Sequence, residues 1–179
     1  MLTKPQRYPY PLVKHLIQNT TGEAQLIGAL AYATGARVSE LNQITAGDFI
    51  EKKQYLEITC PVLKKRKKKI KGKMVKVIPD RVALVRLDET WLINALTKLY
   101  VGKDPTQKVV PYYRMKIWRI LNEAYGINPH GFRKIRATHL VQFGFSAHQL
   151  KHFFGWSSVA PSDYYVKLNT DDLNYEVKE

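Results

Sequence analysis

The period of the apolar residues changes twice along this chain, and that change constrains the fold more than any other feature. From about Leu12 the pattern is helical, and Gly22–Thr34, rich in alanine and apolar on most sides, predicts a buried helix. Between about Asp48 and Pro79 the residues alternate as they do in β-strands. From Glu89 onward the period is helical again. The sequence therefore predicts an α+β fold, mainly helical, with a small three-stranded antiparallel sheet inserted after the first helices.

Two segments carry the sheet signal most clearly. Tyr55–Thr59 and Met74–Ile78 alternate and are rich in β-favouring residues. A lysine-rich connection joins them, so the pattern predicts a β-hairpin, and a third strand is expected near Phe49.

The helical regions have recognisable ends. Gly35 is expected to end the first long helix, and a short helix is expected from Arg37 to Ile44, with Leu41 turned inward. After the sheet, helical periods occupy the segments Glu89–Tyr100, Tyr112–Tyr125, Gly131–Phe143, Ala147–Phe154, Pro161–Leu168 and Asp171–Lys178.

No internal repeat and no long linker rich in Gly, Ser or Pro divides the chain. Residues 1–179 are therefore expected to form a single domain. Residues 1–11 contain three prolines and are expected to be an extended lead-in. Residues 169–179 are expected to be a tail that packs either on its own protomer or on a neighbouring one.

The charge balance favours a polyanionic partner. Twenty-nine Lys and Arg residues against 15 Asp and Glu give a net charge of +14, and such an excess promotes binding to phosphates through counterion release. A soluble basic surface without that partner is the alternative. The single cysteine, Cys60, excludes an internal disulfide and a cysteine-based zinc site. No apolar run reaches the length of a signal peptide or membrane span, so a cytoplasmic location is expected.

The densest charge lies in the predicted connection between the strands. Nine basic residues and no acid fall between Lys64 and Lys76. At the tip of a hairpin they could grip a nucleic-acid backbone, whereas the plainer interpretation is a solvated tip. The expected DNA contacts are Lys65, Arg66, Lys67, Lys68, Lys69, Lys71 and Lys73.

An arginine stands at the predicted start of the short helix. Arg37 follows Thr34-Gly35, where its planar fork and the helix N-terminus could together face a phosphate. Glu40 lies three positions on and so on the same side of the helix. We expect it to be a buried carboxylate that orients Arg37, not a catalyst. A plain surface arginine is the alternative for Arg37.

His130 and Arg133 are spaced by one helical turn at the start of a later helix. That spacing places both side chains next to each other on the same side of the helix. His130 could hydrogen-bond a phosphate oxygen or accept a proton, and Arg133 could neutralise charge that develops on phosphorus. Alone, this pair is a common pattern. His139, further along the same helix, is expected to face the core or the neighbouring helix in a structural role.

Two further segments carry aromatic side chains. Trp156 lies in Phe154-Gly155-Trp156-Ser157-Ser158; its indole N–H can donate a hydrogen bond but cannot exchange protons. A core aromatic is the alternative. Tyr164 and Tyr165 are adjacent on a predicted helix and point about 100° apart, so only one can reach a given point. Tyr164 is expected to anchor the helix.

The segments TGARVSEL, HGFRKIRATHL, FGWSS and DYYVKL, in this order, resemble the catalytic domain of the tyrosine recombinase (phage integrase) family. The resemblance covers roughly Gly22 to Leu168. The family's additional N-terminal domain has no counterpart here and is expected to be absent. The resemblance implies the catalytic residues Arg37, Lys64, His130, Arg133, Trp156 and Tyr165.

The resemblance also decides between neighbouring candidates. Tyr165 lies nine residues after Trp156, the interval that the family shows, which selects it over Tyr164. Trp156 occupies a position where the family usually has histidine. The stretch Val62-Leu-Lys-Lys-Arg resembles the family's lysine-bearing segment and points to Lys64 as the proton donor to the leaving oxygen. Lys65, Lys71 and Lys73 remain alternatives.

The implied reaction is site-specific cleavage and rejoining of double-stranded DNA. The tyrosine forms a 3′-phosphotyrosyl bond, the 5′-hydroxyl leaves, and arginines replace metal ions, so neither metal, ATP nor another cofactor is expected. Strand exchange would pass through a Holliday junction in a dimer or tetramer, with no membrane and no small-molecule substrate, in a prokaryotic or virally infected cell. The alternatives are a type IB topoisomerase and a non-catalytic DNA-binding module. A metal-dependent nuclease is disfavoured, since no carboxylate cluster of ligand type appears.

Overall fold

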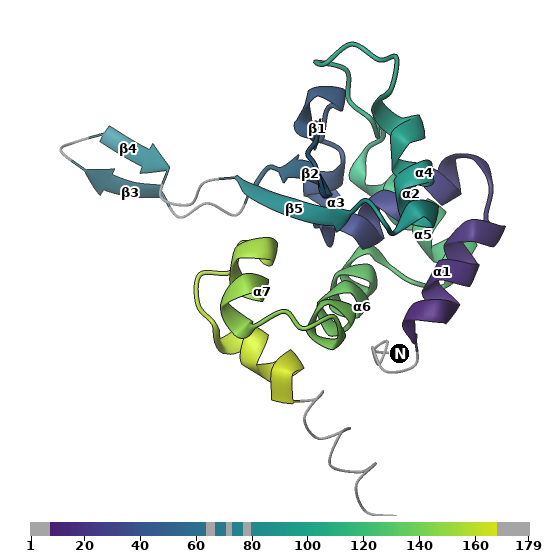
Figure 1. Cartoon of the computed structure of the whole chain (residues 1–179). Coiled ribbons are helices and arrows are strands. Elements are labelled where there is room, and N and C mark those ends of the chain that lie inside the picture. The colour runs from purple at the N-terminus through teal and green to yellow at the C-terminus, as the bar shows by residue number, and fades with distance from the viewer. Residues whose placement is uncertain (1–7, 64–66, 71–72, 77–79, 168–179) are drawn as a thin grey trace, which may run out of the picture.

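The computed structural model describes residues 8–63, 67–70, 73–76 and 80–167. The elements in chain order are α1 (Tyr10–Asn19), α2 (Gly22–Thr34), α3 (Val38–Leu41), the short 3-10 helix η2 (Ala46–Asp48), β1 (Phe49–Glu51), β2 (Tyr55–Cys60), β3 (Lys67–Ile70), β4 (Lys73–Lys76), β5 (Arg81–Arg86), α4 (Thr90–Tyr100), α5 (Arg114–Tyr125), α6 (Pro129–Gln142), α7 (Ala147–Phe154) and a helical segment at 160–167. The mainly helical α+β prediction is confirmed (Figure 1).

Helix α2 is the centre of the fold. It is buried from Ile27 to Thr34, and α1, α4, α5, α6 and β5 all pack against it. A helix that is apolar on all sides can be stable only when neighbours cover it completely. Gly35 ends α2 in the left-handed conformation, with φ of 54°, as expected. A Cβ atom on Gly35 would lie only 2.4 Å from Cε1 of Phe154, so glycine lets the ends of α2 and α7 meet.

The main sheet has the strand order β1-β2-β5, all antiparallel. Leu56, Ile58 and Cys60 of β2 alternate inward, and Ala83 and Val85 of β5 do the same. Both α2 and α7 lie against β5. The sheet therefore closes one side of the helical core and brings the end of α7 close to the end of α2.

The predicted strand pairing was wrong in part. Strand β2 pairs with Arg81–Arg86, a strand that the sequence pattern did not predict, whereas Met74 and its neighbours pair with Lys67–Ile70 in a separate two-stranded ribbon. Figure 1 shows that ribbon projecting beyond the ends of β2 and β5. The reason is that β5 places Arg81 inward and Val82 outward, which hides its alternation.

Helix boundaries also differ from the prediction. Helix α3 ends at Leu41 rather than Ile44, because Ile44 accepts a hydrogen bond from Val109 and leaves the helical path. Leu41 is fully buried, as expected. The predicted helix Asp171–Lys178 lies outside the described residues.

The buried histidine of α6 has its hydrogen bonds fixed by its partners. His139 Nε2 lies 2.8 Å from the carbonyl oxygen of Tyr8, which can only accept, and Nδ1 lies 2.8 Å from the hydroxyl of Tyr32. Nε2 therefore carries the proton and Nδ1 accepts. Burial is the main cause that lowers the pKa of His139 to about 4, and nearby Arg136 lowers it further. His139 is buried in the core, as expected.

This histidine should make folding stability depend on pH. The folded protein keeps His139 neutral, whereas the unfolded chain binds a proton near pH 6.5, so stability present above pH 6.5 is lost as pH falls toward 4. The expected loss is about 3 kcal/mol by pH 4. Urea unfolding measured between pH 7 and 4 should show a flatter dependence for His139→Gln. The exposed His15→Gln should match the wild type; an equal slope in His139→Gln would contradict the assignment.

Candidate active site

Three of the residues singled out in the sequence line one hollow of about 300 Å³. Arg37, His130 and Arg133 meet there, although they lie almost a hundred residues apart in the chain. The other lining residues are Val38, Trp118, Asn128 and Pro129. The hollow is thus formed by the start of α3, by α5 and by the start of α6.

Arg37 is the N-cap of α3 and is held by Glu40. Its Nη1 donates to Oε1 of Glu40 at 2.8 Å, and its backbone N–H donates to Oε2 at 2.9 Å. Glu40 is completely buried, whereas the Arg37 side chain is 33% exposed. The buried carboxylate therefore has the orienting geometry expected of it, and the remaining donors of the guanidinium stay accessible to an anion.

Arg133 lies between the C-terminal ends of helices α2 and α7. Its Nη1 donates to the carbonyl of Gly35 and its Nη2 to the carbonyl of Phe154, both at 2.7 Å. The guanidinium lies 4.7 Å above the Phe154 ring and 5.6 Å from the centre of the Trp156 ring. Burial first, and then the charges of Arg81 and Arg37, lower the pKa of Arg133 to about 9, which leaves it cationic at neutral pH.

His130 stands at the first turn of α6, which begins at Pro129. The side chain of Asn128 caps this helix by accepting a hydrogen bond from the Gly131 N–H at 2.8 Å. The histidine ring remains accessible, yet partial desolvation, followed by the charges of Lys134, Arg133 and Arg37, lowers its pKa. It is therefore neutral at pH 7 and able to accept a proton.

Trp156 and Tyr165 form a stack beside Arg133. The Trp156 ring stacks on Phe154, and Tyr165 lies parallel to Trp156 with 6.0 Å between ring centres and 3° between planes. Burial raises the pKa of Tyr165, and the charge of Arg133 opposes that rise. The phenol therefore lies within the electrostatic reach of one of the two arginines.

The two neighbouring tyrosines have opposite environments. Tyr165 is 9% exposed and Tyr164 is 59% exposed, so the expectation that Tyr164 anchors the helix was wrong. Tyr165 anchors the 160–167 segment through its stack on Trp156. In the described part of the chain it does not line the hollow of Arg37 and His130.

The lysine-rich segment is only partly described. Lys64, the expected proton donor, lies outside the described residues, as do Lys65, Arg66 and Lys71. Lys67, Lys68 and Lys69 belong to β3 and Lys73 to β4. The basic run therefore contributes strands to a ribbon, and the choice of the donor lysine stays a prediction.

Two residues at this site were missed by the sequence reasoning. Trp118 is 42% exposed and lines the hollow, but beside the buried Ile117 it could not be told from a core aromatic. Arg81 is buried between the ends of α2 and α7. A single arginine at the start of an unrecognised strand gave no signal in so basic a chain.

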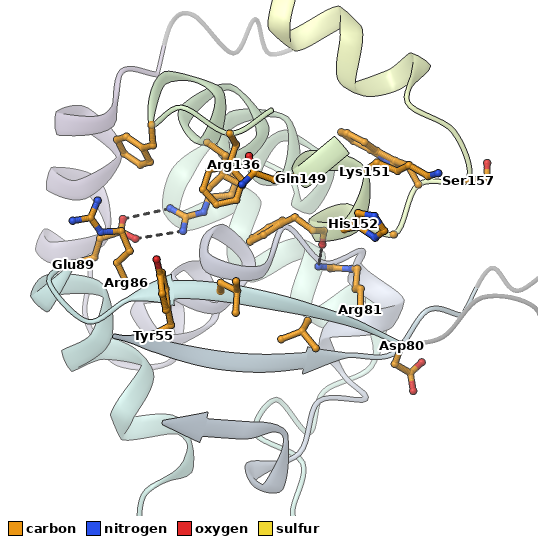
Figure 2. A pocket seen from close by; sticks show the side chains of 18 residues that line it. Tyr55, Asp80, Arg81, Arg86, Glu89, Arg136, Gln149, Lys151, His152 and Ser157 are labelled. Atoms are coloured by element: carbon orange, nitrogen blue, oxygen red, sulfur yellow. Dashed lines mark hydrogen bonds and ion pairs between the residues drawn. The ribbon is translucent and has the colours of Figure 1, made fainter. Parts of the chain in front are cut away.

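A larger hollow of about 1030 Å³ lies between β5, α6 and α7 (Figure 2). Its lining includes Arg81, Arg136 and Trp156 but not Arg37. Within residues 8–63 and 80–167, no three His, Cys, Asp or Glu side chains are grouped as a metal site would require. No helix in the same described residues has the length and hydropathy needed to cross a bilayer.

Sequence comparison gives a family match and distant curated relatives. The model of the phage integrase family matches residues 12–171. Tyrosine recombinase XerD of Corynebacterium glutamicum is 27% identical over 155 residues, which cover 80% of this chain and 48% of the relative. Tyrosine recombinase XerC of Neisseria meningitidis is 25% identical over 147 residues, covering 80% and 47%. The chain spans about half the length of these relatives.

Structural comparison agrees on the fold. The crystal structure of XerA recombinase matches with a TM-score of 0.64 at 20% identity, over 92% of this chain and 61% of that one. The structure of XerH site-specific recombinase bound to palindromic difH substrate, a post-cleavage complex, matches with a TM-score of 0.59 at 20% identity, over 92% and 49%. The arrangement of helices and sheet is therefore shared with these proteins.

Proposed function

The chain belongs to the phage integrase family, and from that premise we propose that it cleaves and rejoins DNA strands site-specifically through a phosphotyrosyl intermediate. The observation that carries the proposal is the convergence of Arg37, His130 and Arg133 on one hollow, with the Tyr165 phenol stacked beside Arg133. Relatives named as tyrosine recombinases, and a similar fold bound to its DNA substrate, support it.

In this proposal a phosphodiester of double-stranded DNA occupies the hollow. Arg37 and Arg133 contact its nonbridging oxygens and offset the charge that develops as phosphorus becomes five-coordinate. His130, which is neutral at pH 7, accepts the proton of the phenol or hydrogen-bonds a phosphate oxygen. The indole N–H of Trp156 donates a hydrogen bond.

Tyr165 is the proposed nucleophile. Its oxygen forms a bond to phosphorus while the bond from phosphorus to the 5′ oxygen breaks, and Lys64 donates the proton that the 5′ oxygen needs. The 160–167 segment must shift to bring the phenol from its stack on Trp156 into the hollow. The reverse reaction reseals a strand, and since the phosphotyrosyl bond conserves the energy of the phosphodiester, neither ATP nor a metal ion is required.

The remaining partners are proposed on the same basis. The basic run between Lys64 and Lys76 contacts the DNA backbone through Lys65, Arg66, Lys67, Lys68, Lys69, Lys71 and Lys73. Exchange between two duplexes requires several copies of the protein on DNA, so a dimer or tetramer is proposed.

The function is tested by trapping the covalent intermediate. A pool of nicked duplexes of random sequence releases a short fragment after cleavage and so prevents resealing. Incubation in EDTA should give an adduct that survives denaturing electrophoresis. An adduct that requires added Mg²⁺ would contradict the metal-independent mechanism. Absence of an adduct from every pool would favour the non-catalytic module, and plasmid relaxation without strand exchange would favour the topoisomerase.

A further inference from the structure

Arg81 is a buried cation beside the candidate active site that the proposed chemistry leaves unused. It is the first residue of β5, its Cα pairs with that of Cys60, and it is 4% exposed. Among the described residues, Arg81 is not one of those that line the hollow of Arg37 and His130, so a phosphate bound in that hollow would not contact it. Its role must therefore be exerted through other residues.

Arg81 and Arg133 both bridge the C-terminal ends of helices α2 and α7. Nη1 of Arg81 donates to the carbonyls of Thr34 and Phe153, both at 2.8 Å. Figure 2 shows the bond to Phe153 as a dashed line from Arg81. Arg133 donates to the carbonyl one residue later at each helix end, those of Gly35 and Phe154. The two guanidiniums thus act as successive ties between the end of α2 and the end of α7. Carbonyls at helix C-termini carry partial negative charge, which favours cations there.

Arg81 also shares the carboxylate that orients Arg37. Its Nη2 lies 3.7 Å from Oε2 of Glu40, whose Oε1 accepts from Arg37. Glu40 is completely buried. The buried carboxylate is therefore held between two arginines, one of which faces the hollow and the other the core.

Packing places Arg81 against the turn that carries Trp156. A Cβ atom on Gly155 would lie 3.2 Å from Cδ of Arg81. One residue before Arg81, the Asp80 carboxylate accepts a hydrogen bond from the Val62 N–H at 3.1 Å, where β2 leaves the main sheet. Arg81 therefore lies where the segment that carries β3 and β4 rejoins the main sheet.

The contacts of Arg81 are stabilising only in part. Two of its donors, Nε and Nη2, are buried without a hydrogen-bond partner, although Nη2 lies 3.7 Å from the Glu40 carboxylate. Buried donors that lack acceptors are unfavourable, and this cost offsets part of what the bonds to Thr34 and Phe153 contribute.

We propose that Arg81 is a positioning residue for strand cleavage. It fixes the end of α2, the end of α7 and Glu40 in one arrangement, so that Arg37, Arg133 and Trp156 converge on one phosphate. The inference rests on the proposed function and adds to it a residue that does not touch the substrate.

The test compares Arg81→Met and Arg81→Lys with a matched variant of the same strand. Val85 is fully buried in β5 and lines neither hollow, so Val85→Ala controls for loss of packing. We expect Arg81→Met to slow single-turnover adduct formation at saturating nicked DNA by about 100-fold, as small misplacements of catalytic groups do. Arg81→Lys should recover part of the rate. DNA affinity should change little, and Val85→Ala should lower the thermal midpoint without changing the rate of the folded protein.

The possible results are distinguishable. If the wild type forms an adduct and Arg81→Met forms it equally fast, or slows it only as much as Val85→Ala, the positioning role is overturned while the proposed function stands. If the wild type forms no adduct, the proposed function fails and this inference fails with it. Should Arg81→Met not fold, Arg81→Lys is combined with Glu40→Gln. Effects on the rate that are less than additive would support a shared pathway, and additive effects would overturn it.

Discussion

Tyr165→Phe is expected to abolish the covalent protein–DNA adduct, with the rate of adduct formation falling by roughly 10⁴-fold or more because the attacking oxygen itself is lost. The phenyl ring can still stack on Trp156, so the variant should fold and bind nicked DNA as the wild type does. Denaturing electrophoresis of the nicked-duplex reaction measures the adduct, and filter binding measures affinity.

Tyr164→Phe supplies the matched control. It makes the same chemical change one residue earlier, on a side chain that is largely exposed. Adduct formation should be unaffected. An adduct that persists in Tyr165→Phe and disappears in Tyr164→Phe would reverse the assignment, and one that persists in both would place the nucleophile elsewhere.

Arg133→Lys should be the next most damaging change. Lysine keeps the charge but has no planar fork, so it cannot bridge the carbonyls of Gly35 and Phe154 while it also faces the hollow. We expect single-turnover adduct formation at pH 7.5 to fall by about 10³-fold, the loss seen when one preorganised donor is removed from a developing charge.

The pH dependence distinguishes this cause from simple unfolding. Burial lowers the pKa of Arg133 to about 9, so wild-type activity should decline as pH rises above 9. Burial also favours the neutral form of a lysine at this site. The residual activity of Arg133→Lys should therefore increase toward lower pH. Arg86→Lys, at an exposed position of β5, should behave as the wild type. A loss in Arg133→Lys that follows only the folded fraction would contradict the catalytic role.

The sequence was most informative where local periodicity and the final fold agree. The apolar segment Gly22–Thr34 predicted α2 with its observed bounds, and the glycine after it predicted the end of that helix. His130 and Arg133 are one turn apart, so a helix was enough to bring them together. These predictions depended on short-range geometry alone.

Long-range packing could not be predicted from the local patterns of the sequence. The partner of β2 could not be predicted, because an inward arginine and outward valine in β5 remove the usual alternation. Tyr164 and Tyr165 are chemically identical, so which of them is buried depends on where Trp156 lies. The role of Arg81 was hidden for the same reason, since its partners come from α2 and α7.

The hydrogen bonds by which Arg133 and Arg81 join the ends of α2 and α7 affect when the site can form during synthesis of the chain. Arg133 bonds to a carbonyl 98 positions earlier, and Arg81 bonds to one 72 positions later. Closing such long loops is entropically unfavourable until many other contacts form. A nascent chain that still lacks α7 has neither arginine fully bonded, so the proposed site can assemble only after α7 has been synthesised.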